Sequence, residues 1–391
     1  MDIQLSERVQ RVKPSMTLEI AAKAKQFKAE GRDIVSLDAG QPDFATPAHI
    51  IQAAKQAMDN GETGYTAVDG TPMVKQAIID KFKRDNGLDY QMDQILVSSG
   101  GKQSFYNLCQ AFLNTGDEVI IPAPYWVSYP DMVLLADATP VIVTATQQTG
   151  FKLTPKQLES AITASTRLFV INSPSNPTGV AYRQNELAAL AEVLSQYPHI
   201  IIATDDMYEH VVFSGKSFCN ILDVAPDLYH RTVVLNGVSK AYAMTGWRIG
   251  YAGGPAKLIQ AMKKIQSQST SNPVSISQAA TVEALNGNQD HIKTYGEAYE
   301  RRHAFVLKAL NQIDGVHCLP SDGTFYSFPN VKGMMARLGL DSDIALADYL
   351  LESCDLSVVP GEAFGLKGHI RLSFATSMAQ LKKGLARLAK V

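Results

Sequence analysis

Short runs of apolar residues recur along the first two thirds of the chain, and segments with helical spacing separate most of them. The runs cover residues 95–98, 118–121, 168–172, 200–204 and 232–235. Because they are apolar on both faces, they are typical of strands in a mainly parallel sheet with helices on either side. The alternation of such strands with helices predicts an α/β fold.

Three Thr-Pro pairs predict the starts of helices. Thr46-Pro47, Thr71-Pro72 and Thr154-Pro155 each place an N-cap residue before a proline at the first helical position. Residues 257–311 also follow a helical pattern, and Pro273 predicts a break within it.

The pattern changes after residue 311. Apolar runs at 316–319, 325–329, 356–359 and 369–374 predict strands, and residues 341–353 and 378–390 predict helices. We interpret this region as part of a smaller α+β domain, which the N-terminal segment joins through a loop at residues 40–43. The expected division is a large domain over residues 46–300 and a small domain built from residues 1–45 and 301–391.

Composition directs attention to small-molecule chemistry. The 391 residues include 36 basic and 38 acidic side chains, which give a formal net charge of −2, and 46% of the residues are hydrophobic. This balance excludes a disordered chain and argues against nucleic acid or a membrane surface as a partner. Residues 1–15 are too polar for a signal peptide, and no apolar run approaches the roughly 18 residues that span a bilayer.

The cysteines are few and widely spaced. They form no Cys-x-x-Cys or Cys/His pattern that would predict a disulfide framework or a zinc site. Their positions are Cys109, Cys219, Cys318 and Cys354. We therefore expect a cytoplasmic protein without a bound metal.

Residues that follow each predicted strand are candidates for chemistry, because an open parallel sheet binds ligands beyond the carboxyl ends of its strands. After the first strand comes Gly100-Gly101-Lys102-Gln103, followed by a predicted helix over 104–113. Such a turn lets backbone N–H groups and the helix dipole hold an anion, most simply a phosphate, although it is often purely structural. A Walker A loop is excluded, because Lys102 precedes Gln and not Ser or Thr.

Two later strands also end in polar residues. Asn176 lies between two prolines in the loop after residue 172, and Asp205, Asp206 and Tyr208 follow the strand at 200–204. A carboxylate at the end of a buried strand either caps a helix or needs a cationic partner. The amide of Asn176 can equally be a satisfied group in a rigid loop.

Lys240 lies in the glycine-bounded loop 237–250, among small and aromatic neighbours. Loss of solvation in such a loop lowers the pKa of a lysine and leaves neutral amine that can form a Schiff base. Most lysines are solvated surface residues, so the apolar setting is what favours a catalytic role. Arg248, in the same loop, can pair with a phosphate through two hydrogen bonds.

This loop resembles the pyridoxal-phosphate attachment signature of class I and II aminotransferases. The likeness continues in order and spacing over roughly residues 10–390, through the Gly-rich turn, Tyr125-Trp126, Asn176-Pro177-Thr178-Gly179, Asp205 with Tyr208, Lys240, Arg248 and Arg371. Within the family, the chain is most similar to bacterial aspartate aminotransferases of the shorter subgroup. The resemblance implies fold type I, in which a mostly parallel seven-stranded sheet flanked by helices forms the large domain beside a smaller α+β domain.

The resemblance also implies a role for each matched residue toward pyridoxal 5′-phosphate. Lys240 would form the Schiff base and move the substrate proton, and Asp205 would pair with the pyridine nitrogen. Tyr208 and Asn176 would hydrogen-bond the 3′ oxygen, and Trp126 would stack on the ring. The phosphate would be held by Gly101, Lys102, Ser239 and Arg248, together with Tyr65 from a neighbouring subunit, which implies a homodimer.

For the substrate, Arg371 would bind the α-carboxylate through two parallel hydrogen bonds, helped by Asn176, Trp126 and the backbone of Gly40. The alternative for Arg371 is an exposed position on an edge strand. A dicarboxylate also needs a cation for its distal group. The long-chain subgroup supplies an arginine that has no match here, so Lys102 is the expected partner, which weakens its assignment to the phosphate.

The expected reaction is transfer of the amino group of L-aspartate to 2-oxoglutarate in a ping-pong cycle. Aromatic, methionine or prephenate aminotransferases would retain every cofactor residue, because only the contacts to the distal group differ. A C–S lyase of this fold would regenerate the aldehyde form of the cofactor, whereas transamination leaves its amine form. A non-catalytic binding or regulatory protein of the same fold is the alternative from a different class.

Overall fold

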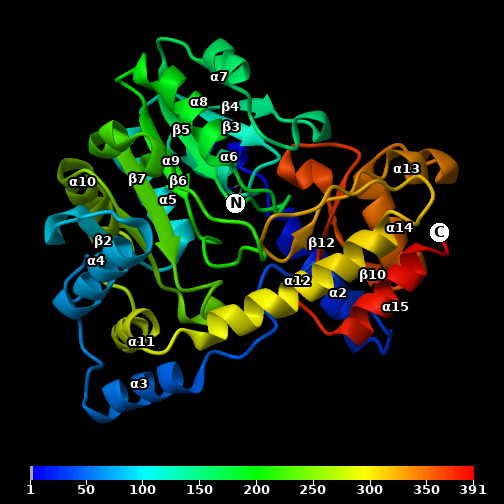
Figure 1. Cartoon of the computed structure of the whole chain (residues 1–391), viewed down its shortest axis with the longest axis horizontal. Coiled ribbons are helices and arrows are strands. Elements are labelled where there is room, and N and C mark those ends of the chain that lie inside the picture. The colour runs from blue at the N-terminus through cyan, green and yellow to red at the C-terminus, as the bar shows by residue number, and fades with distance from the viewer. Residues whose placement is uncertain (1–2) are drawn as a thin grey trace.

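A seven-stranded sheet forms the centre of the larger part of the molecule in the computed structural model, which describes residues 3–391 (Figure 1). Strand β8 runs antiparallel to both of its neighbours, and the other pairs are parallel. The spatial order is β2 (Ile95–Ser98), β8 (Gly250–Gly253), β7 (Thr232–Gly237), β6 (Ile201–Asp205), β5 (Thr166–Asn172), β3 (Glu118–Ala123) and β4 (Thr139–Thr144). The mostly parallel α/β sheet expected from the sequence is confirmed.

Side chains on alternate positions of the central strands pack into two separate cores. On β5, Leu168 and Val170 join one core, whereas Phe169 and Ile171 join the other. Helices α5 (Gly101–Phe112), α6 (Tyr129–Leu135) and α10 (Ala256–Ser267) cover the first face. The second face is covered by α3 (Ala48–Asp59), α4 (Pro72–Asn86), α8 (Gln184–Ser195), α11 (Ser275–Asn286) and the short α9 (Ile221–Val224).

Two of the three predicted helix caps are confirmed. Thr71 accepts a hydrogen bond from the N–H of Val74 at the start of α4, and Thr154 caps α7 (Pro155–Ala161) in the same way. Thr46 does not cap α3, which begins at Ala48. Its hydroxyl instead donates to the carbonyl oxygen of Ala243 at 2.8 Å, so a tertiary contact to the Lys240 loop replaces the local cap.

The smaller part of the molecule combines the N-terminal and C-terminal segments. Strand β1 (Val35–Ser36) pairs in parallel with β10 (Leu356–Ser357), and β12 (Ile370–Ser373) lies between β11 (Val359–Pro360) and β9 (Tyr326–Ser327). Helices α2 (Met16–Ala29), α13 (Lys332–Leu338), α14 (Asp343–Cys354) and α15 (Met378–Leu388) surround these strands.

Two strand predictions in this region need correction. The expected strand at 316–319 is wrong, because its ladder reduces to a single bridge between His317 and Asn330. The side chain of Asn311 bonds to both the N–H and the C=O of Cys318, which satisfies that backbone without a neighbouring strand. The run at 356–359 is divided between β10 and β11, which pair with different strands.

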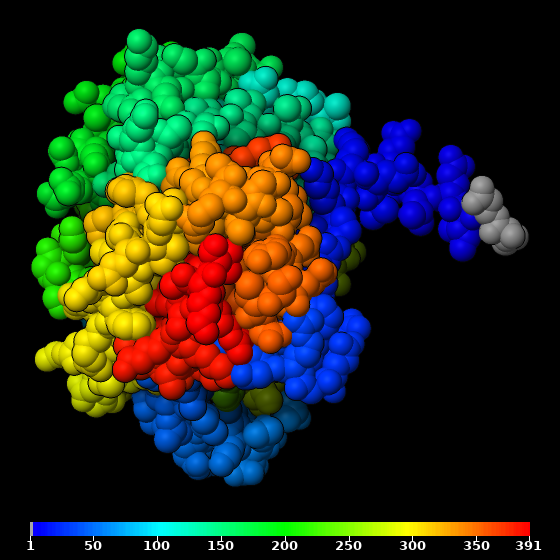
Figure 2. Space-filling view, turned by 90° about the vertical axis from the view of Figure 1, so that its right-hand side faces the viewer, coloured from blue at the N-terminus to red at the C-terminus, as the bar shows by residue number. Residues whose placement is uncertain are grey.

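The long helix α12 (Asp290–Leu310) runs from beside α11 toward the C-terminal elements, as Figure 1 shows in yellow. The segment predicted to be helical therefore contains three helices, and α10 and α11 are separated around Pro273 as expected. At the other end of the chain, α1 (Glu7–Arg11) pairs Arg8 and Arg11 with Asp137, and the N-terminal segment in dark blue projects from the body (Figure 2). Across residues 3–391, every helix is too short or too polar to cross a bilayer.

Candidate active site

Lys240 lies beyond the carboxyl end of β7, in the loop that leads to β8. Its Nζ donates a hydrogen bond to the carbonyl oxygen of Gly40 at 2.6 Å. Desolvation, reinforced by the positive charges of Arg371 and Arg248, lowers the pKa of Lys240 to about 8, and Asp205 opposes this shift. A useful fraction of the side chain is therefore neutral amine near pH 7.

Asp205 is the last residue of β6, and two donors orient its carboxylate. The Tyr129 hydroxyl donates to Oδ2, and the N–H of Met207 donates to Oδ1 at 3.2 Å. Burial raises the pKa of Asp205, while these two hydrogen bonds and the charge of Lys240 act in the opposite direction. The site thus holds an oriented carboxylate whose charged form would be stabilised further by a cationic ligand.

Two hydrogen bonds fix the planar guanidinium of Arg371 on β12, which we call the arginine fork. Nη1 donates to Oδ1 of Asn176 at 3.0 Å, and Nη2 donates to the carbonyl oxygen of Asp38 at 2.8 Å. The guanidinium carbon lies 4.4 Å from the ring centroid of Tyr326. Arg371 is only 3% exposed and lies on the central strand of its sheet, so the alternative of an exposed edge-strand arginine is wrong.

One nitrogen of the Arg371 guanidinium makes no hydrogen bond within the described residues. This nitrogen is Nε, and it is buried. A buried charged donor without a partner is costly unless a ligand satisfies it. A carboxylate matches this need, because it accepts parallel hydrogen bonds from a guanidinium.

The start of α5 forms a second anion-binding feature. Gly100 precedes the helix with φ at 92°, which favours glycine, and a Cβ there would displace the guanidinium of Arg248. Arg248 is held over this turn by hydrogen bonds to the carbonyl oxygens of Thr245 at 2.9 Å and Ser99 at 3.3 Å. The first N–H groups of a helix have no partners within it, and together with a guanidinium they suit a phosphate.

Lys102 and Trp126 lie together. Lys102 Nζ lies 5.3 Å from the ring centroid of Trp126, which packs edge-on against Tyr129 at 5.1 Å. Desolvation and the charge of Arg248 lower the pKa of Lys102, and Asp131 opposes them. Since Tyr129 also bonds Asp205, these contacts connect the indole ring to the carboxylate.

Most of the predicted site residues are thus linked by direct contacts. Lys240 contacts Gly40, Arg371 contacts Asn176, and Arg248 lies over Gly100 and the start of α5. Ser239 is buried and directly precedes Lys240. Tyr65 is different, because it is 95% exposed in the loop between α3 and α4.

Three residues at the site were not assigned a role from the sequence. They are Tyr129, which bonds Asp205, Asp38, whose carbonyl oxygen holds Arg371, and Tyr326, whose hydroxyl lies 3.0 Å from that of Tyr208. Tyr129 lies three residues after Trp126, a helical spacing that could have suggested a shared face. The contacts of Asp38 with Arg371 and of Tyr326 with Tyr208 join distant segments, so no local sequence pattern could have indicated them.

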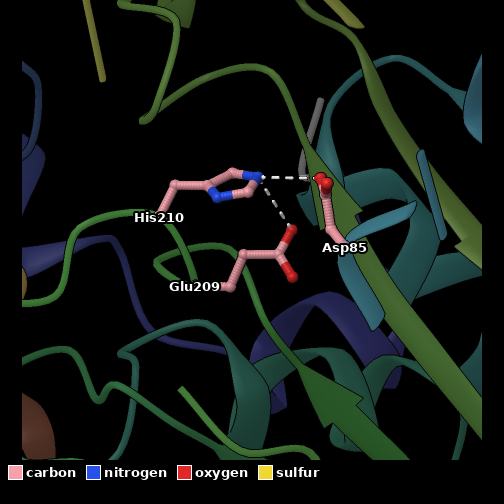
Figure 3. A group of neighbouring side chains, drawn as sticks. All are labelled: Asp85, Glu209 and His210. Carbon is pink, nitrogen blue, oxygen red and sulfur yellow. Dashed lines mark ion pairs between the residues drawn. The ribbon is translucent and has the colours of Figure 1, made fainter. Parts of the chain in front are cut away.

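A separate ionic cluster is formed by Asp85, Glu209 and His210, the last two of which directly follow Tyr208 in the chain. Figure 3 shows the His210 ring pointing one nitrogen at two carboxylates, with Nε2 at 3.3 Å from Asp85 Oδ2 and 3.4 Å from Glu209 Oε1. These three residues have the donor types of a metal site. However, the ammonium of Lys81, which is 1% exposed, already forms an ion pair with Glu209. We therefore interpret the cluster as an ion-pair network that extends from the buried Glu209 to the exposed Asp85.

The mostly parallel sheet, the Lys240 loop and the buried Arg371 are the features expected of a pyridoxal-phosphate aminotransferase. Comparison with known families gives the same class of enzyme. The family model for class I and II aminotransferases matches residues 32–388, and the chain belongs to this family.

Relatives cover the whole chain. The aspartate/prephenate aminotransferase of Nitrosomonas europaea is 57% identical over 395 residues, with 100% of both chains covered. The aspartate aminotransferase of Rhizobium meliloti strain 1021 is 49% identical, covering 99% of this chain and 95% of the relative. Among solved structures, the aspartate aminotransferase of R. meliloti superposes with a TM-score of 0.95 at 48% identity, covering 100% and 98% of the two chains. That of Thermus thermophilus with maleate gives 0.93 at 41% identity, with full coverage of both chains.

Enzymes of this family depend on pyridoxal 5′-phosphate, as this protein does. The residues present fit that cofactor. The bare start of α5 under Arg248 suits the phosphate, and the buried carboxylate of Asp205 suits a protonated ring nitrogen. Lys240, with its lowered pKa, suits the aldehyde.

Proposed function

We propose that this enzyme transfers the amino group of L-aspartate to 2-oxoglutarate, giving oxaloacetate and L-glutamate. The observation that carries the proposal is the buried Nε of Arg371, which has no partner among residues 3–391, in a guanidinium whose positive charge acts on Lys240. This arrangement offers one group for the α-carboxylate of an amino acid and a second for the chemistry at its α-carbon. The aspartate and aspartate/prephenate aminotransferases among the relatives support this choice of substrate.

When bound, pyridoxal phosphate supplies an electron-withdrawing ring that stabilises negative charge at the substrate's α-carbon. Lys240 would hold the aldehyde carbon, and its freed amine would move the proton between the α-carbon and C4′. Asp205 would accept a hydrogen bond from the ring nitrogen and keep that nitrogen protonated. Tyr129 holds Asp205 in place for this task through its own hydroxyl.

The other matched residues would hold the rest of the cofactor. Tyr208 and Asn176 would hydrogen-bond the 3′ oxygen, and Trp126 would cover one face of the ring. Gly101 with the start of α5, Ser239 and Arg248 would hold the phosphate. The Asn176 amide also bonds Arg371, so it would serve the cofactor side and the substrate side together.

Lys102 is our candidate for the distal carboxylate of the substrate. It is exposed beside Trp126 and carries a charge that no carboxylate of the described chain pairs within 4 Å. Prephenate is a second candidate acceptor, because it is a 2-oxo acid with a second carboxylate and two of the relatives are aspartate/prephenate aminotransferases. One lysine can serve the distal group of either substrate.

The direct experiment follows the absorbance of the bound cofactor in purified holoenzyme. L-aspartate at low concentration should convert the aldehyde form to the amine form, and 2-oxoglutarate or prephenate should restore it. L-phenylalanine and L-methionine should need much higher concentrations. Conversion by L-phenylalanine alone at low concentration would reject the aspartate assignment, and release of an elimination product without amine form would indicate a lyase.

Lys102→Gln tests the distal contact. Because a charge-assisted hydrogen bond contributes about 1.5–3 kcal/mol, we expect the KM for L-aspartate to rise at least roughly tenfold. The KM for L-phenylalanine should change little, since it has no distal charge. Lys264→Gln, at an exposed position of α10, is the matched control. Equal losses for both amino acids would instead place Lys102 at the phosphate.

We also propose that the enzyme is a homodimer in which Tyr65 reaches the phosphate of the neighbouring subunit. An aromatic side chain that is 95% exposed on a loop supports this, because it gains burial from a partner. Mixed dimers provide the test. Tyr65→Ala and Lys240→Ala subunits, each weak or inactive alone, should recover about a quarter of wild-type activity after random exchange, because half the dimers carry one intact site. A monomer in sedimentation, or no recovery, would reject the shared site.

Two further expectations remain proposals. We propose that residues 46–300 form the cofactor-binding domain, with 1–45 and 301–391 forming the small domain. The pairing of β1 with β10 supports the second unit. We propose a cytoplasmic location because all four cysteines are free within the described residues, as is usual in a reducing compartment.

A further inference from the structure

Tyr326 lies between the two halves of the site. It is on β9 of the small three-stranded sheet and is fully buried, and its hydroxyl lies 3.0 Å from the hydroxyl of Tyr208. Tyr208 follows β6 of the large sheet. This hydrogen bond therefore connects the two sheets between Arg371, which lies over the Tyr326 ring, and Lys240, which lies over the Tyr208 ring.

The ring of Tyr326 has a second contact. Strand pairing places Tyr326 opposite Ser373, two residues from Arg371 on the same face of the sheet. The guanidinium carbon of Arg371 lies 4.4 Å from the ring centroid, within range of a cation–π interaction. Phe364 flanks the same guanidinium at 5.0 Å. The arginine fork thus packs against two aromatic rings.

A phenol hydroxyl has one proton to donate and can accept hydrogen bonds as well. If Tyr208 gives its proton to the 3′ oxygen of the cofactor, Tyr326 is the donor that can complete the bonding of Tyr208. A donor in that position polarises the Tyr208 hydroxyl and makes it a stronger donor itself. Among residues 3–391, Tyr326 is the hydrogen-bond partner of the Tyr208 hydroxyl.

We propose that Tyr326 is a positioning residue of the aminotransferase: its hydroxyl sets the donor strength of Tyr208, and its ring fixes the Arg371 fork. This proposal rests on the proposed function and extends it, because it assigns two separable tasks to one side chain. The hydroxyl acts on the cofactor side, and the ring acts on the substrate side.

The charged groups around the pair are Arg371 on β12, Asp205 at the end of β6 and Lys240 in the β7–β8 loop. Lys240 Nζ lies 5.9 Å from the ring centroid of Tyr208. Burial raises the pKa of Tyr208, with Tyr326 and Asp205 acting in the same direction and Arg371 opposing them. Tyr208 therefore keeps its proton across the pH range in which the bound cofactor is titrated.

Two variants separate the two tasks. Tyr326→Phe removes the hydroxyl and keeps the ring, whereas Tyr326→Leu removes both. Tyr90→Phe is the matched control, because Tyr90 is equally buried and its hydroxyl has no hydrogen-bond partner in the described part of the chain. Each holoenzyme is titrated by absorbance against pH, and its dissociation constant for succinate, a dicarboxylate without an amino group, is measured at fixed pH.

For Tyr326→Phe, the midpoint of the absorbance titration should rise by roughly 0.5 unit, because a weaker donor at the 3′ oxygen stabilises the deprotonated form less. Its succinate affinity should stay within about twofold of wild type. Tyr326→Leu should show the same rise and about tenfold weaker succinate binding, since the guanidinium loses its support. Tyr90→Phe should match wild type in both measurements.

A wild-type titration curve for Tyr326→Phe would overturn the role of the hydroxyl, and unchanged succinate binding in Tyr326→Leu would overturn the role of the ring. If the leucine variant fails to fold, Tyr326→Met is measured in its place, because the flexible methionine side chain adapts to the space that the ring leaves. Failure of the proposed function would look different, because wild-type holoenzyme itself would then show no spectral change with L-aspartate.

Discussion

Replacement of Arg371 by lysine tests the clamp for the substrate α-carboxylate. The guanidinium makes hydrogen bonds to Asn176 at 3.0 Å and to the carbonyl oxygen of Asp38 at 2.8 Å, and it leaves Nε for a ligand. An ammonium group keeps the charge but cannot reproduce this planar geometry. A lysine in this position would have to give up either the anchors or the carboxylate.

The expected loss of kcat/KM follows from the hydrogen bonds that the guanidinium makes. A hydrogen bond to a charged group is worth about 1.5–3 kcal/mol, and Arg371→Lys removes at least one such bond to the substrate and loosens the two anchors. A total of about 3 kcal/mol corresponds to a fall of roughly 100-fold in kcat/KM for L-aspartate. Part of the fall should be in kcat, because a misplaced substrate reacts more slowly even when it is bound.

The assay is steady-state transamination of L-aspartate and 2-oxoglutarate with purified holoenzyme, together with half-reactions that give the substrate dissociation constant directly. Arg337→Lys is the control, since Arg337 pairs with the exposed Asp314 at the surface. The cofactor absorbance of Arg371→Lys should still show a bound cofactor. A kcat/KM within threefold of wild type would refute the role of Arg371 as the clamp.

Three further perturbations follow from the structure. Lys240 has a pKa of about 8, and only its neutral amine reacts with the aldehyde of pyridoxal phosphate. The rate of covalent cofactor uptake by apoenzyme should therefore rise with pH and level off above about pH 8. A rate that continues to rise to about pH 10 would contradict the lowered pKa. Gly100→Ala should weaken cofactor binding at least roughly tenfold in an equilibrium titration, because the new methyl group displaces Arg248 and strains a left-handed backbone. Lys81→Met should lower the free energy of urea unfolding by about 3 kcal/mol, because the buried Glu209 loses its ammonium partner and keeps only His210 and two amide donors among the described residues. The double variant with Glu209→Gln should recover part of the loss.

The sequence was informative where a single segment carries the whole signal. Strands β2, β3, β5, β6 and β7 were predicted from continuous apolar runs, because each is buried on both faces. Strand β4 was missed because it lies at the edge of the sheet, where exposed and half-buried side chains replace that run. Strand β8 was missed because its sequence is Gly-Tyr-Ala-Gly. Its first glycine is needed where the backbone passes close to Gly100 and Gly101.

The site residues also fall into those that a local pattern could locate and those that depend on tertiary packing. Lys240 and Arg248 share one loop and could be found together, and the order of the other matched residues located Asp205 and Arg371. Tyr129 and Asp205 are 76 residues apart in the chain, and Tyr208 and Tyr326 are 118 apart. Their hydrogen bonds depend on how helices and sheets pack, which no local pattern encodes.

The segment after β1 shows how the fold couples the two halves of the site. The carbonyl oxygen of Asp38 anchors Arg371, and that of Gly40 accepts the hydrogen bond of Lys240. Both contacts use the backbone, so they depend on the path of the segment more than on its side chains. That path begins at the pairing of Val35 with Leu356, which ties it to the C-terminal strands. A displacement of this segment would therefore alter the carboxylate clamp and the reactive amine together, even though neither residue had changed.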